Sequence, residues 1–131
     1  MRAPIFYAAM LLIVSSSVLA AQPDCANAVT QADMDQCASI SLKASDAKLN
    51  QTYKALLAKV SKDGKVKLQK AQRAWIGWRD AQCDFIAAGS SGGTIHSMAQ
   101  ASCINQLTQA QTKLLDSQLH CQEGDVSCGN Q

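Results

Sequence analysis

Apolar residues recur at helical spacing in the first half of the chain. Beyond position 30 they follow one another at intervals of three, four and seven residues, at Leu42, Leu49, Tyr53, Leu56 and Val60. Such spacing places them on one face of an α-helix. Thr30 followed by Asp33 has the form of a capping box with Thr30 as N-cap. We therefore predict a helix over residues 32–60, closed by Gly64 in a left-handed conformation.

Two more helical segments follow. The second covers residues 65–87, and its inward face is expected to carry Leu68, Ala71, Trp75, Trp78 and Gln82, with Cys83 adjoining. The glycine- and serine-rich run 89–93 then interrupts the pattern. Thr94 is a suitable N-cap for a third helix that runs to residue 119, with an apolar side made of Met98, Ser102, Leu107, Leu114 and Leu115. No segment alternates as a strand does, so we predict an all-α fold, a small antiparallel three-helix bundle.

The first twenty residues have the features of an export signal. Arg2 supplies a positive charge, and an apolar run extends from Ile5 to Val14. Small residues precede a cut expected after Ala20, with a cut after Ala21 as the alternative. An uncleaved membrane anchor is the competing interpretation, but a spanning helix needs about 20 apolar residues. We divide the chain into a signal peptide (1–20), a helical domain (21–119) and a short cysteine-containing tail (120–131). We expect no membrane association after signal cleavage.

Six cysteines follow the signal, at Cys25, Cys37, Cys83, Cys103, Cys121 and Cys128. An even number of cysteines in an exported chain indicates disulfides, and hence a periplasmic or secreted protein. Fifteen pairings are possible, and proximity in sequence favours Cys25–Cys37, Cys83–Cys103 and Cys121–Cys128. A zinc site is the alternative, but close Cys-x-x-Cys pairs are absent and only His120-Cys121 are neighbours. We expect disulfides that staple the bundle, with no metal and no cofactor.

The low net charge and the lack of a catalytic motif argue against nucleic-acid binding and against enzymatic activity. The net charge is +2, and +1 without Arg2, which argues against a nucleic-acid partner. Basic residues gather in one stretch, at Lys54, Lys59, Lys62, Lys65, Lys67 and Lys70. Such a stretch is usually a solvated face, and the alternative is a patch for anionic polymers. His96 near Ser90 is the one imaginable nucleophile pair, but nothing resembles a nucleophile elbow. We expect no enzymatic activity.

The segment 71–83, Ala-Gln-Arg-Ala-Trp-Ile-Gly-Trp-Arg-Asp-Ala-Gln-Cys, is highly distinctive. It resembles the signature of the LprI-type lysozyme inhibitor family, formerly a domain of unknown function. Further similarities to that family are Asp24-Cys25 with Cys37, the segment 45–50 with Tyr53, and Gly92-Gly93-Thr94 with Met98 and Cys103. The resemblance covers residues 24–115. One departure is Gln111, which stands where the family usually carries an arginine.

The resemblance implies a secreted binding protein whose partner is lysozyme. We interpret its signature residues as mainly structural: Asp46, Tyr53, Trp75, Trp78, Arg79 and Asp80. Arg79 is expected to form an interhelical ion pair with Asp46. The two tryptophans are expected to fill the core, in one aromatic cluster with Tyr53 and Phe85.

Two functions remain open. In the first, a loop carrying hydroxyl donors and glycines enters the lysozyme cleft, and its candidate residues are Ser90, Ser91, Gly92, Gly93, Thr94 and His96. The same segment can also be a simple helix-to-helix turn. In the second, the chain is a non-inhibitory envelope or protein-interaction module that contacts peptidoglycan or another envelope protein through its lysine-rich stretch.

Overall fold

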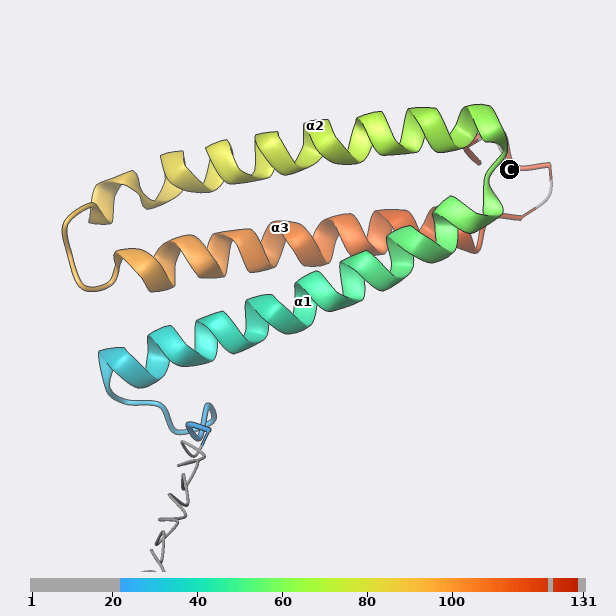
Figure 1. Cartoon of the computed structure of the whole chain (residues 1–131). Helices are drawn as coiled ribbons and strands as arrows, with labels where there is room; N and C mark the ends of the chain where they lie inside the picture. The colour runs from blue at the N-terminus through green and yellow to red at the C-terminus, as the bar shows by residue number, and fades with distance from the viewer. Residues whose placement is uncertain (1–21, 123, 130–131) are drawn as a thin grey trace, which may run out of the picture.

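The computed structural model describes residues 22–122 and 124–129. In that part of the chain three long helices, α1 (Gln31–Lys59), α2 (Lys62–Ala87) and α3 (His96–Leu119), form an all-α bundle, as predicted (Figure 1). A short 3₁₀ helix, η1 (Ala88–Ser90), follows α2 directly. The expected signal peptide, residues 1–20, lies outside the described residues. None of the described helices is long and apolar enough to span a membrane.

The helices run antiparallel in succession, and α3 lies between the other two (Figure 1). Contacts between α3 and α1 are the most extensive, those between α3 and α2 are fewer, and α1 and α2 contact each other little. In Figure 1, α1 and α2 meet at the short connection after α1 and separate towards their other ends. Helix α3 therefore makes most of the contacts that hold the bundle together.

Side-chain caps fix the helix boundaries, and two of the expected caps are wrong. Thr30 accepts a hydrogen bond from the backbone N–H of Asp33 at 3.1 Å, as predicted. Gly64 does not close α1, because it lies in the first turn of α2. Ser61 is the N-cap of α2, and its hydroxyl accepts a hydrogen bond from the Gly64 N–H at 3.2 Å. Thr94 does not cap α3, which starts at His96 after Ile95 without a side-chain cap.

The core is small and lies towards the end where α1 and α2 meet. Leu49, Leu56, Val60 and Leu115 are buried, and the partly buried residues packed against them are Tyr53, Leu68, Trp75 and Leu119. The predicted apolar stripe of α1 is therefore confirmed. On α3, Leu115 is buried, but its neighbour Leu114 is exposed, contrary to expectation.

The inward face of α2 agrees with the prediction at Leu68 and Trp75, which pack against the core, and differs from it at other positions. Gln72 is buried, whereas the predicted Ala71 is exposed; Cys83, which was expected beside this face, is buried, and Gln82 is half-buried. Likewise Arg79 points inward in place of Trp78, which is exposed. The disulfide of Cys83 and the contacts of Arg79 set the rotation of this helix, and hydrophobicity alone does not reveal them.

Three disulfides hold the fold, with the pairings that proximity favoured: Cys25–Cys37, Cys83–Cys103 and Cys121–Cys128. The first ties the segment before α1 to its first turns, and the last closes a loop in the tail. The second joins α2 to α3 over a sequence separation of 20 residues. In the chain-entropy model, closing a loop of that length stabilises a protein by roughly 3 kcal/mol.

Candidate functional site

The candidate site is the connection between α2 and α3, at the end of the bundle away from the α1–α2 connection (Figure 1). Cys83 and Cys103 form a buried disulfide between the two helices that flank it. Gly92 has a φ of 78°, in the left-handed region that glycine adopts without steric cost. The loop is thus short, covalently anchored and turned at a glycine.

Ser90 and His96 lie side by side and hold the base of the loop. The Ser90 hydroxyl donates to the Ala87 carbonyl at 2.7 Å. His96 Nδ1 lies 3.1 Å from the same carbonyl and 3.2 Å from Ser90 Oγ. Because a carbonyl only accepts, we assign the proton to Nδ1. Nδ1 is then a donor, and it cannot act as a base towards Ser90. The pair is a structural clamp rather than a nucleophile and its base.

The tip of the loop faces solvent. Ser91, Gly92, Gly93 and Thr94 are all exposed. Backbone hydrogen bonds brace them, from the Gly93 N–H to the Ser90 carbonyl at 2.9 Å and from the Ser91 N–H to the Ala88 carbonyl at 3.1 Å. Of the six candidate loop residues, four therefore form an accessible tip, while Ser90 and His96 are half-buried beneath it.

Exposed apolar side chains flank this loop, and sequence reasoning missed them. Phe85 is 77 % exposed in the last turn of α2, where Ile86 is also exposed, and Ile95 is exposed just before α3. Clustered exposed apolar groups often mark a protein-binding surface. The sequence could have indicated this exposure, because Phe85 and Ile86 do not lie on the face of α2 that carries Cys83, and Cys83 is buried.

Arg79 connects all three helices. From α2 it lies 3.4 Å from an Asp46 oxygen on α1 and donates to the Thr108 hydroxyl on α3 at 3.1 Å. It also pairs with its neighbour Asp80 at 2.8 Å, and its guanidinium lies 5.1 Å from the centre of the Trp75 ring. The Arg79 side chain is 13 % exposed and that of Asp46 44 % exposed. The expected Arg79–Asp46 ion pair is present, at the edge of the core.

The expected aromatic cluster is only half formed. Tyr53 and Trp75 pack against the core. Trp78 is 53 % exposed, and Phe85 is more exposed still. The prediction that both tryptophans fill the core is wrong for Trp78, because Arg79 takes the inward position beside it.

Comparison with known proteins identifies the family. The family model described as "Lysozyme inhibitor LprI" matches residues 23–115, well over half of the chain. This chain belongs to the LprI family. An uncharacterized protein of Rhizobium meliloti (strain 1021), R02472, is 36 % identical over 104 residues, which cover 70 % of this chain and 75 % of that protein. No solved structure matches the chain.

The LprI match includes the loop, the disulfides Cys25–Cys37 and Cys83–Cys103, and the Arg79 contacts. The family's description names inhibitors and no enzyme. Gln111 donates to the Gln72 side-chain carbonyl at 3.3 Å. An amide pair thus connects α3 to α2 at this position.

The tail lies beyond the LprI match. In the part of the chain that the structure describes, potential metal ligands gather at Cys121, Asp125 and Cys128. The two sulfurs are bonded to each other, so neither is a thiolate that could bind a metal. Hydrogen bonds from the Ser127 side chain and backbone lower the pKa of Asp125. The group is thus part of a hydrogen-bonded turn.

Proposed function

We propose that this protein is a secreted or periplasmic inhibitor that blocks lysozyme with the loop between α2 and α3. The observation that carries the proposal is the LprI match over residues 23–115, whose family description names lysozyme inhibitors. Three disulfides support a location outside the cytosol, where such bonds persist. The braced loop offers the rigid projecting surface that an inhibitor needs.

The chemistry of the loop suits a lysozyme cleft. That cleft contains two carboxyl groups, one acting as acid and one as anion. The hydroxyls of Ser91 and Thr94 are exposed donors at the tip. Gly92 and Gly93 between them present backbone without side chains and permit close approach. Beside the tip, Phe85 supplies the aromatic contact area that typically dominates binding energy at interfaces.

Charge contributes little to this interface. Residues 85–95 contain no ionisable side chain, with Asp84 before them and His96 after them, and the net charge without Arg2 is only +1. Lysozyme is strongly basic, so a partner that relied on electrostatic attraction would be acidic. We therefore expect affinity to come from apolar contact and hydrogen bonds. Inhibition should change little between low and physiological salt, because screening acts on charges.

A bacterial-lysis turbidity assay with the purified mature protein and lysozymes of several types tests the proposal. Excess protein should slow lysis by at least one lysozyme type. Phe85→Ser should weaken inhibition at least tenfold if this ring anchors the interface. Val66→Ser is the matched control, because Val66 is also an exposed apolar residue of α2 but lies near its other end. Undiminished lysis with every lysozyme type would reject the proposal.

A second candidate function follows from the lysine-rich stretch. All six of its lysines, at 54, 59, 62, 65, 67 and 70, are exposed around the α1–α2 connection. Lys59 donates to the Leu119 carbonyl at 2.8 Å, and the stretch as a whole presents positive charge. A non-inhibitory module would use it to bind an anionic envelope polymer. Co-sedimentation with insoluble peptidoglycan, lost on raising the salt concentration, would support this function.

A further inference from the structure

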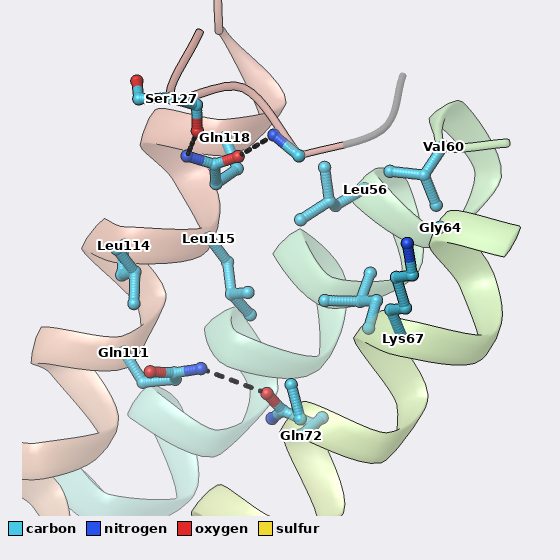
Figure 2. Close-up of a pocket in the computed structure, with 13 residues that line it drawn as sticks. Leu56, Val60, Gly64, Lys67, Gln72, Gln111, Leu114, Leu115, Gln118 and Ser127 are labelled. Carbon is cyan, nitrogen blue, oxygen red and sulfur yellow. Dashed lines mark hydrogen bonds between the residues drawn. The ribbon is translucent and has the colours of Figure 1, made fainter.

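A cavity of about 570 Å³ opens at the end of the bundle opposite the loop, where α1 meets α2. Its volume lies within the range of small-molecule sites, roughly 300–1,000 Å³. Its apolar walls are formed by Leu56 of α1, by Val60 directly after α1 and by Leu115 of α3 (Figure 2). Leu68 of α2 also lines it. Leu56, Val60 and Leu115 belong to the buried core cluster, so the cavity adjoins the core.

Small residues of α2 leave this space open. Gly64 and Ala71 lie two turns apart on the α2 wall of the cavity. Large side chains at these positions would fill the gap between α2 and the other helices. The α2 lining extends from Gly64 to Gln72, which corresponds to a slot roughly 12 Å long at the helical rise. An elongated apolar slot without an aromatic ring in its described lining suits an alkyl chain.

Polar groups close both ends of the slot. Gln111 and Gln72 bond to each other at one end, at 3.3 Å (Figure 2). At the other end the Gln118 amide donates to the Ser127 carbonyl at 3.1 Å and accepts from the Gly129 N–H at 2.7 Å. These contacts hold the disulfide-closed tail beside the slot, so that Ser127 and Gly129 form part of its lining. Because the LprI match ends at residue 115, this part of the lining is formed by a segment outside the family domain.

One charge lies on the slot. Lys67 is the only ionisable residue among the described residues that line the cavity, and no described acidic residue lines it. Figure 2 shows its side chain along the α2 wall with the ammonium directed towards the Gly64 end. An apolar slot with a single cation at its edge is complementary to a molecule with one apolar chain and one negative head.

We propose that this cavity binds a free single-chain alkyl carboxylate. The chain lies between Leu56, Leu68 and Leu115, and the carboxylate pairs with Lys67. The site is independent of the proposed lysozyme interface, since the two occupy opposite ends of the bundle. A failure of laurate to bind would therefore leave the proposed lysozyme inhibition untouched, and a failure of inhibition would leave the proposed laurate site untouched.

Isothermal titration calorimetry with laurate, kept below its micelle concentration, tests the proposal on the mature protein. We expect saturable binding of one laurate, with no binding of acetate and at least fivefold weaker binding of dodecyltrimethylammonium. Lys67→Met, which keeps the stem and removes the charge, should weaken laurate binding about five- to tenfold. Lys70→Met is the matched control, an exposed lysine of the same stretch outside the cavity lining, and should bind as the native protein does.

Ala71→Leu tests the slot itself. The added side chain should fill the cavity and abolish laurate binding, while Ala74→Leu, on an exposed position of α2 outside the lining, should leave binding unchanged. Circular dichroism checks whether each variant folds. If Ala71→Leu does not fold, the comparison of Lys67→Met with Lys70→Met tests the proposal instead. Failure of laurate to bind, equal binding of the cationic amphiphile, equal losses in both lysine variants, or binding only to phosphatidylglycerol vesicles would each overturn the proposal.

Discussion

At the scale of single residues, Arg79 is a side chain of α2 that contacts both other helices. It contacts Asp46 on α1, Thr108 on α3 and Trp75 on its own helix. Thr108 is fully buried, so its hydroxyl relies on such a partner. The sequence predicted the pair with Asp46 from motif positions on adjacent helices. It could not predict the Thr108 contact, which depends on how α3 is rotated.

Arg79→Ala should destabilise the protein by about 2 kcal/mol. The loss is smaller than for a fully buried pair, because Asp46 is 44 % exposed and water can solvate its carboxylate once Arg79 is gone. Urea unfolding monitored by circular dichroism measures it. Arg73→Ala removes an exposed arginine of the same helix and should change stability little. An unchanged midpoint for Arg79→Ala would show that these contacts do not stabilise the fold.

Gly92→Ala should destabilise the loop, since Gly92 has a φ of 78° and alanine pays roughly 1–2 kcal/mol in that conformation. Gly89→Ala is its control. Gly89 has no positive φ, and an added Cβ there meets no atom within 4 Å. Thermal unfolding should therefore show a lower midpoint for the first variant and no loss for the second. Equal midpoints in both variants would contradict the left-handed turn.

At the scale of elements, periodicity predicted α1 well and α2 less well. The α1 stripe consists mostly of large apolar residues that enter the core, so counting them reveals its face. On α2 the inward positions include Gln72, Arg79 and Cys83, whose burial depends on an amide partner, an ion pair and a disulfide. These partners lie on other helices. Hydrophobicity therefore favoured the neighbouring positions and placed Trp78 inside.

Removing the Cys83–Cys103 disulfide should cost roughly 3 kcal/mol of stability. The bond joins α2 to α3 across the candidate loop, so its loss frees a long segment of the unfolded chain. Cys83→Ala with Cys103→Ala is compared with Cys121→Ala and Cys128→Ala by urea unfolding. The second pair closes only a short tail loop after α3 and should cost less. A greater loss from the tail pair would contradict this ranking.

At the scale of the whole molecule, the bundle presents two different ends. The loop end carries exposed hydroxyls and apolar residues, and the other end carries the apolar cavity and lysines. The helix α2 spans the distance between them, roughly 39 Å for its 26 residues. The sequence indicated the loop and the lysines, because both are continuous stretches. It gave no sign of the cavity, which forms only where three helices and the tail converge.

The two ends should respond independently to mutation, because substitutions far apart without shared partners have nearly additive effects. Ala71→Leu should leave inhibition of lysis unchanged, and Phe85→Ser should leave laurate binding unchanged. Measuring both activities in both variants checks this. Loss of both activities in either variant, with its folding intact, would show that the ends are coupled.

The most direct test of the central claim is hydrogen exchange of the mature protein, followed by mass spectrometry, with and without excess lysozyme. If the loop between α2 and α3 enters the lysozyme cleft, peptides covering residues 85–96 should become protected while those covering 54–70 exchange as before. Protection confined to residues 54–70, or no protection anywhere, would contradict the account.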